Sequence, residues 1–352
     1  MSLSAQARED VVPGSLYTSA RAAGMADAFS PLADDTPSAL FYNPAAIAKT
    51  KKAHFEPLNL GISMNADYVG TLDSNFYNIY NLSAFKSTLQ NNPFTMPGAG
   101  ATYIPSFAIP ELGPMPAIAG GMLLDTSLAS SYNNGAYMYR SRYMLVPALG
   151  LGWTLAHGII HIGYTMQWIN EDVGTIQPAP LPLSYTTSLN QGSAFSHNVG
   201  FMMTLPMQFL PTINLIGRNL FGTTFSSTDL LPLATSPAGV PTALPMTFDG
   251  AFSISPRIGS NSFLNWVMIY RDFLGASGVN MLTRLTAGAE FEIKKTLFLR
   301  AGFGSGYPSA GIGYKKSSGE IQLAWSGEEI GMGGFQNKIE RRWIVQFQAR
   351  AF

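Results

Sequence analysis

Short segments of the C-terminal stretch, from Met281 to Phe352, alternate strictly between apolar and polar side chains. The alternation passes through four short segments between Arg284 and Trp325 and returns in a fifth after them. Because a period of two places successive side chains on opposite faces of a strand, this stretch predicts neighbouring strands of one antiparallel sheet. The sheet fits either a soluble protein with its polar face in water or a transmembrane barrel with its apolar face in lipid.

The scarcity of charge favours the transmembrane barrel. Charged residues make up only 12% of the 352 residues, and none occurs between Val173 and Gly217. Soluble chains carry about 25% charged residues, whereas a lipid-facing surface cannot carry them. The formal net charge is zero, so nothing in the composition suggests a polyanionic partner such as nucleic acid. The chain has no cysteine, which excludes disulfides and thiolate metal sites.

The rhythm of apolar residues predicts about fourteen strands after residue 51. The connections alternate in length, with short ones such as 110–113 and 207–210 between long ones such as 67–97, and the very short connection 305–307 is the exception. Short turns at one rim, long loops at the other and an even strand count are typical of a bacterial outer-membrane barrel. The expected strands are 53–66, 98–109, 114–128, 136–155, 158–170, 195–206, 211–219, 247–256, 261–271, 282–293, 296–304, 308–316, 320–327 and 341–352.

Two other architectures fit the sequence less well. A soluble sandwich gives no reason for connections that alternate in length. A membrane-spanning helix could be read in the uncharged run from Tyr143 to Tyr164. Pro147 and several glycines interrupt that run, and its alternation is typical of strands.

The first 51 residues differ from the rest and have helical and turn character. Asp35-Thr36-Pro37-Ser38 has the chemistry of a helix start, and Asn43-Pro44-Ala45 that of a tight turn into a short helix. Ala5-Gln6-Ala7 has the form of a signal-peptide cleavage site without an apolar region before it, which suggests a polar tail or a shortened precursor.

Segments 19–29, 31–35 and 38–45 together resemble the N-terminal signature of the FadL/PorV-like outer-membrane barrels. That superfamily includes long-chain fatty-acid and aromatic-hydrocarbon transporters and PorV-type secretion proteins. Segments 213–220 and 287–314 are also similar to it. The resemblance implies a fourteen-stranded barrel formed by residues 52–352, whose lumen is occupied by a plug formed by residues 1–51. The plug and gating residues that it implies are Asp34, Asp35, Asn43, Pro44 and Ala45, with a plain helix-start turn as the alternative for Asn43-Pro44.

The polar face of the last strands carries charges of both signs, which we expect to line the lumen. They would pair with one another or with the plug, and they would either gate a polar lumen or simply hydrate and rigidify the wall. These residues are Arg284, Glu290, Glu292, Arg300, Glu320, Arg342 and Arg350. Phe352 departs from the pattern, because it falls on the parity of Arg350 rather than on the apolar face.

Three of the predicted outer loops, 67–97, 171–194 and 220–246, are apolar for loops. Exposed apolar patches often mark a binding site, so these loops could capture a hydrophobic ligand. Packing of the loops on one another, or on a partner protein, is the alternative. The candidate capture residues are Phe76, Tyr77, Phe85, Phe94, Phe221 and Phe225.

The predicted function is passive uptake of small hydrophobic compounds, fatty-acid-like or aromatic, across a bacterial outer membrane. The alternative is a non-transporting interaction or structural protein of that membrane. We expect no enzyme, because no G-x-S-x-G elbow occurs, and no cofactor. His157 and His161 would lie about 13 Å apart on a strand, too far to share a metal ion. The expected partners are membrane lipid, a hydrophobic ligand and the barrel-assembly machinery, and not nucleic acid.

Overall fold

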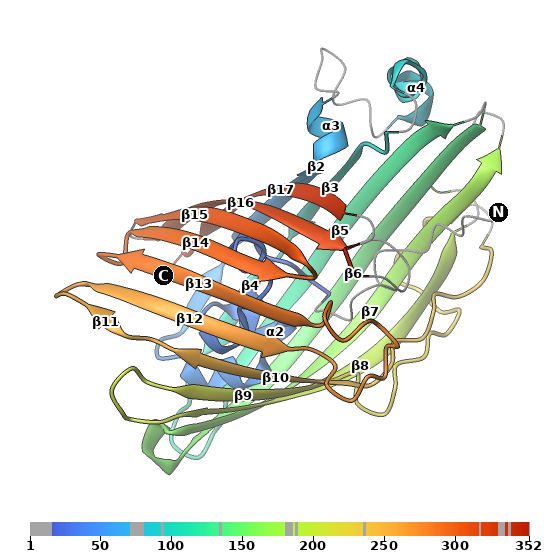
Figure 1. Cartoon of the computed structure of the whole chain (residues 1–352). Coiled ribbons are helices and arrows are strands. Elements are labelled where there is room, and N and C mark those ends of the chain that lie inside the picture. The colour runs from blue at the N-terminus through green and yellow to red at the C-terminus, as the bar shows by residue number, and fades with distance from the viewer. Residues whose placement is uncertain are drawn as a thin grey trace.

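A computed structural model of the protein shows a closed antiparallel β-barrel with helices inside one part of it (Figure 1). The structure describes residues 16–70, 81–92, 95–133, 136–179, 186, 189–234, 237–316, 318–329, 335–336 and 339–351. The expected cleavage-site motif and Phe352 lie outside these residues.

Within the described residues, seventeen strand segments form one sheet. The sheet closes because the last strand, β17, pairs with β2 from Asn65 to Leu58. Three pairs of segments (β1 with β2, β3 with β4, β10 with β11) are single strands with an interruption, so the barrel has fourteen strands. Pro57 and Pro105 stand at two of the interruptions, where a residue without a backbone N–H breaks the ladder. The predicted fold class is therefore confirmed.

The strands are β1 (His54–Glu56), β2 (Leu58–Asn65), β3 (Gly98–Tyr103), β4 (Ser106–Ile109), β5 (Ala117–Asn133), β6 (Ala136–Leu155), β7 (Ile160–Ala179), β8 (Asn190–Thr204), β9 (Thr212–Arg218), β10 (Thr247–Ile254), β11 (Arg257–Ile258), β12 (Ser262–Tyr270), β13 (Leu285–Ile293), β14 (Leu297–Gly304), β15 (Tyr307–Lys316), β16 (Gly319–Glu329) and β17 (Ile339–Ala349). The helices are α1 (Ala20–Ala23), η2 (Ser30–Leu32), α2 (Thr36–Phe41), η3 (Pro44–Lys49), α3 (Ala66–Gly70), α4 (Leu82–Asn91) and η5 (Ala156–Gly158). No helix in the described part of the chain is long and apolar enough to cross a membrane.

The faces of the last five strands follow the predicted parity. Leu285, Leu299 and Phe347 are exposed on the outer surface, whereas Glu290 and Gln346 are buried inside the barrel. An apolar outside around a polar, occupied inside is the arrangement of a transmembrane barrel, since lipid satisfies no polar side chain. The protein is therefore an outer-membrane β-barrel.

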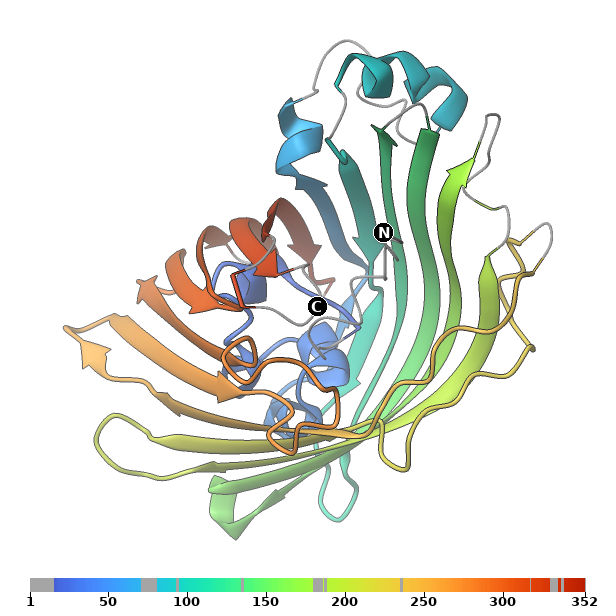
Figure 2. The same ribbon diagram turned by 45° about the vertical axis from the view of Figure 1, so that its right-hand side comes forward.

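The wall of the barrel has an uneven height. β5, β6 and β7 contain 17, 20 and 20 residues, whereas β9 contains 7 and β14 contains 8. About 9–11 residues suffice to cross a bilayer, so the long strands continue beyond it. Figures 1 and 2 show these green strands rising past the shorter orange and red ones. Because β9 ends at Arg218, the segment 220–244 takes its place along the upper edge of β8, for example in the bridge between Ser193 and Ser226.

Two predicted loops are wrong in detail. Most of 171–194 is strand, because β7 continues to Ala179 and β8 begins at Asn190. The alternation of apolar residues that defines a lipid-facing strand stops at polar Asn170, so the sequence hides this extension. The predicted loop 67–97 contains helix α4 and most of α3, and the buried side chains of Tyr68 and Phe85 pack there against strands β5 and β6.

Candidate functional site

The helices of residues 20–49 lie inside the barrel, and a polar side chain caps the start of three of them, α1, α2 and η3. The Ser19 hydroxyl accepts a hydrogen bond from the Ala22 N–H, and the Asp35 carboxylate accepts one from the Ser38 N–H. The buried Asn43 side chain accepts from the Ala45 N–H and donates to the Ser30 carbonyl at 3.0 Å. Asn43 therefore joins η3 to η2. We call residues 16–49 the plug.

Glycines of the long wall hold η3 in direct backbone contact. Gly152, Gly163 and Gly200 are paired across β6, β7 and β8, so they form one row on the inner face. A Cβ added to Gly163 would lie 2.0 Å from the Pro44 carbonyl oxygen, and one added to Gly200 would lie 2.6 Å from the Ala45 nitrogen. Only glycine allows two backbones to approach this closely.

A second row of glycines holds the first helix of the plug against the short wall. Gly288 of β13 and Gly302 of β14 are paired, and both face Met25. A Cβ on Gly302 would lie 2.3 Å from the Met25 carbonyl carbon, and one on Gly311 would lie 3.1 Å from the Gly24 Cα. The plug is thus fitted to the wall on two opposite sides.

Arg21 ties the plug to the wall through a buried carboxylate. Its guanidinium donates to both oxygens of Glu290, at 2.8 Å and 2.7 Å, and to Asp34 at 2.7 Å. Arg300 of β14 donates to the same Glu290 at 2.7 Å. Glu290 and Arg300 have no exposed side-chain surface, and a charge buried in this way needs a close partner of opposite sign.

Asp34 has the only half-exposed carboxylate of this group, with 52% of its side chain accessible. Burial raises the pKa of Asp34, but the attraction of Arg21, Lys315 and Lys49 outweighs it, so its pKa lies below the ordinary value. Asp34 is therefore a permanent anion at neutral pH and helps to orient Arg21.

Two further arginines of the wall hold the other side of the plug. Arg218 of β9 donates to the carbonyl oxygens of Phe41 and Tyr42, at 3.3 Å and 2.9 Å, and pairs with Asp249 at 2.9 Å. It thereby satisfies the carbonyls that helix α2 leaves unpaired at its C-terminal end. Arg271 pairs with Asp27 of the plug.

The remaining predicted lumen charges lie on the wall, where they pair with wall residues or nearby loops. Arg350 donates to Glu56 at 2.6 Å, Glu320 lies 3.3 Å from Lys315, and the Arg284 guanidinium contacts Asp272. Glu292 is half-buried on the same parity as Glu290. In these pairs the charges join wall residues and loops to one another, whereas Glu290 also binds the plug.

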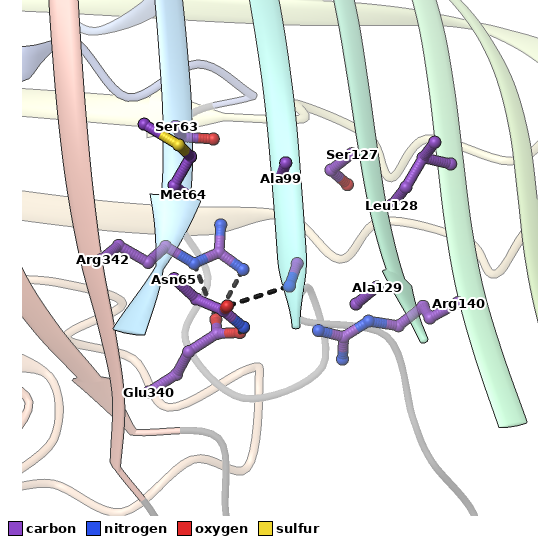
Figure 3. Close-up of a pocket in the computed structure, with 11 residues that line it drawn as sticks. Ser63, Met64, Asn65, Ala99, Ser127, Leu128, Ala129, Arg140, Glu340 and Arg342 are labelled. Carbon is purple, nitrogen blue, oxygen red and sulfur yellow. Dashed lines mark hydrogen bonds and ion pairs between the residues drawn. The ribbon is translucent and has the colours of Figure 1, made fainter. Parts of the chain in front are cut away.

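Arg342 takes part in closing the barrel seam. Figure 3 shows Arg342, Glu340 and Asn65 pointing toward one another across β17 and β2. Arg342 donates to Glu340 at 2.7 Å, and Asn65 donates to Glu340 at 3.3 Å and to the Met96 carbonyl at 2.8 Å. The Asn65 oxygen accepts from the N–H groups of Tyr68 and Gly98, both at 2.9 Å. The first and last strands are thus fastened at the rim of the long loops.

A cavity of about 480 Å³ lies between the plug and the rim of the long loops. Leu16, Phe41 and Ala26 of the plug form part of its lining. Strands from both the long and the short wall contribute residues, including Gln167, Val173 and Ile344. The segment 242–247, which leads into β10, also lines the cavity. Charged residues on its border include Arg142, Arg218, Arg271, Arg342 and Glu329.

The candidate capture residues have different surroundings. Phe76, Tyr77 and Phe94 lie outside the described residues. Phe85 is fully buried on α4 and does not face solvent, which corrects its expected role. Phe225 packs against the core that surrounds the plug, whereas Phe221 is 91% exposed. Of the three candidates that the structure describes, Phe221 is the one whose side chain is open to contact with a ligand or with lipid.

Sequence reasoning missed several plug contacts on the wall. Arg218 of β9 and Asp249 of β10 occupy inward-facing positions of their strands. The alternation of apolar and polar residues could therefore have identified them. Tyr17, which receives a hydrogen bond from Gln346 at 2.6 Å, carries no local signal. Among the residues that the structure describes, no group of three or more potential metal ligands occurs.

Comparison with solved structures finds outer-membrane channels. A mutant of the monoaromatic hydrocarbon channel TodX is 9% identical, with 88% of this chain and 92% of that chain covered and a TM-score of 0.49. An outer-membrane channel from Pseudomonas putida F1 is 10% identical, with coverage of 88% and 99% and a TM-score of 0.43. A Pseudomonas aeruginosa FadL homologue is 10% identical, with coverage of 95% and 98% and a TM-score of 0.39. No family model matches the chain, and no curated protein is similar to it.

Proposed function

We propose that this protein is an outer-membrane channel for the passive uptake of small, mainly apolar compounds. The observation that supports it best is the cavity of about 480 Å³ above the plug. Its volume lies within the range of about 300–1,000 Å³ that is typical of sites for small molecules. The barrel places this cavity on the side of the long loops, which face the outside of the cell in such proteins.

The lining of the cavity supports a ligand with a large apolar part. Phe41, Val173, Leu244 and Ile344 offer apolar surface from the plug, the wall and the segment 242–247. The arginines on its border are held by carboxylates or by plug carbonyls, as Arg218 is. The apolar surface would hold a hydrocarbon skeleton, and the arginines would attract a polar or anionic end group. The similar solved structures, one of them named as a monoaromatic hydrocarbon channel, agree with this class of solute.

A cavity-filling variant tests the proposal. Ala243 lines the cavity, so Ala243→Trp should reduce the binding of alkylbenzenes and medium-chain fatty acids to the purified protein by about tenfold or more. Ala238→Trp, on the same segment but away from the cavity lining, is the control and should bind normally. Uptake of the same compounds by cells that carry each variant provides the second readout. If both variants bound and took up these compounds equally well, the cavity would not be part of the transport route.

A second candidate, a non-transporting interaction or structural protein, is favoured by the way the plug is held. Two glycine rows and the buried Arg21–Glu290 pair hold it in place. A barrel that only supports other membrane proteins would need a plug that stays in place, and it would not need a path for a solute through the barrel. Affinity purification from detergent distinguishes the two functions: a stoichiometric protein partner together with unchanged cellular uptake after gene deletion would favour this second candidate.

A further inference from the structure

The rim of short turns is divided into two arcs of different chemistry. One arc comprises four neighbouring turns: 110–116, 156–159, 205–211 and 255–261. Together they contain only two charged residues, Glu111 and Arg257. Their exposed side chains include polar His157, Gln208, Arg257, Ser260 and Asn261 and six large apolar ones: Leu112, Met115, Met207, Phe209, Leu210 and Ile258. We call these four turns the apolar arc.

The other arc consists of the entry to β1, the β13–β14 turn and the β15–β16 turn. Along it lie Lys51 and Lys52, Lys294 and Lys295, and Lys315 and Lys316, the last two at the end of β15, where Lys315 is on the inward parity and pairs with Glu320. These are six of the nine lysines of the chain, and only Lys49, Lys86 and Lys338 lie elsewhere. We call these three connections the basic arc. Barrel order places it directly opposite the apolar arc.

In both arcs, some of these residues have backbone angles that are unfavourable for a residue with a Cβ. Phe209 and Leu210 have φ angles of 73° and 44°, and Lys294 and Lys295 have φ angles of 52° and 56°. Residues with a Cβ seldom adopt this left-handed region, which glycine or asparagine occupies more easily. The Ser255 N–H donates to the Phe209 carbonyl at 2.7 Å and fixes two apolar turns to each other. Bulky apolar and cationic side chains thus occupy turn positions that Asn-Gly would fit better.

We propose that this rim is seated obliquely in the inner leaflet of the outer membrane. The apolar arc enters the acyl chains, and the basic arc binds the phosphates of anionic phospholipids. The occupant is thus a phospholipid leaflet, not a soluble partner.

Continuity with the lipid-facing wall carries this proposal. Exposed Phe107 and Ile109 of β4 lead into Leu112, and exposed Leu155 leads into the β6–β7 turn, so the apolar belt continues into the apolar arc, interrupted only by Glu111, which accepts a hydrogen bond from the Thr154 N–H, and by His157. On the opposite side, Ile293 and Tyr314 end the belt directly at paired lysines. Lysines next to a bilayer are attracted to anionic headgroups, which supplies the charge complementarity. The same tilt would raise the long strands β5–β8 on the outer side, where their extra length lies.

The absence of cysteine makes a site-specific test direct. Phe209→Cys and Leu112→Cys report on the apolar arc, and Ser318→Cys reports on the basic arc. Each variant is labelled with an environment-sensitive fluorophore and placed in nanodiscs of phosphatidylcholine with a minority of phosphatidylglycerol, where both rims are open to solution. Labels at 209 and 112 should be quenched by brominated acyl chains roughly twofold or more better than the label at 318. Iodide in the water should quench in the opposite order.

Equal access of iodide to all three labels would overturn the proposal, because an aqueous docking face for a soluble partner requires that result. The basic arc has its own test, in which native mass spectrometry counts the phosphatidylglycerol that stays bound. The variant with Lys51, Lys52, Lys294 and Lys295 changed to Gln should retain it about fivefold less tightly for each lysine removed. Lys86→Gln, on α4 among the long loops, is the control. Equal retention by the two variants would overturn the headgroup contact.

Discussion

Arg21 of the plug and Glu290 of the wall form a two-point contact, with hydrogen bonds of 2.8 Å and 2.7 Å, and Arg300 approaches Glu290 from the wall. The contact joins residues that lie 269 positions apart in the chain. It shows that one carboxylate stabilises both the barrel and its contents.

The first prediction concerns this contact. Arg21→Ala should cost about 3–5 kcal/mol in the stability of the docked plug, because it leaves buried Glu290 with one cation instead of two. Urea titration, followed by protease cleavage within residues 20–49, measures the loss. Arg341→Ala, which removes an exposed arginine stacked on Trp325, is the matched control and should change the midpoint little. The same cleavage profile for both variants would contradict the prediction.

The second prediction concerns the glycine rows. Gly163→Ala should displace η3 from β7, because the new methyl group would overlap the Pro44 carbonyl. We expect a cost of about 1–3 kcal/mol or more from this overpacking. Gly61→Ala is the control, since the nearest atom to its added Cβ is 3.7 Å away. Hydrogen exchange of the plug amides should rise in Gly163→Ala and stay unchanged in Gly61→Ala.

The third prediction concerns pH. The pKa of Asp34 is lowered in the folded protein by Arg21 and two lysines, which outweigh burial, so its contribution is present above the unfolded pKa of about 3.9. That contribution is lost as the pH falls through the lower, folded value. Wild type should therefore protect its plug better than Asp34→Asn near neutral pH, and the difference should vanish in strong acid. Pepsin cleavage and hydrogen exchange follow the acid range. A difference that grew with acidity would refute the assignment.

The fourth prediction concerns the strained β13–β14 turn. Lys294→Asn combined with Lys295→Gly should stabilise the barrel in a neutral detergent by about 1–2 kcal/mol, because both positions have positive φ angles and Asn-Gly favours such a two-residue hairpin. The urea midpoint measures the gain. Ser318→Gly, at the neighbouring turn, is the comparison. A lower midpoint for the double variant would show that the lysine side chains stabilise the turn in ways that its backbone does not reveal.

The sequence allowed the wall to be predicted well, because lipid imposes its pattern on every strand. Each of the fourteen expected ranges overlaps an observed strand, and Glu290 and Arg300 are buried inside the barrel. The upper parts of β7 and β8 were lost because polar Asn170 and Asp172 end the alternation where loops replace lipid.

The contents of the lumen were predicted less completely. Turn chemistry around Asp35 and Asn43 marked the helix starts of the plug, and the caps are as that chemistry requires. Many partners of the plug lie more than 100 positions away, as in the contact of Arg218 with Tyr42, 176 positions apart, and nothing local specifies them. In the sequence, the inward glycines are small residues at the polar positions of the alternation. Their contact with the plug backbone depends on the closed barrel, so the alternation does not predict it.

The glycine rows also constrain the order of assembly. A plug that touches the wall backbone to backbone on two sides leaves no clearance through which it could slide into a finished cylinder. The plug directly precedes β1 in the chain, and β17 completes the seam with β2. We therefore expect the plug to be in place before the seam closes, so that the sheet forms around it and the pairing of β17 with β2 encloses it.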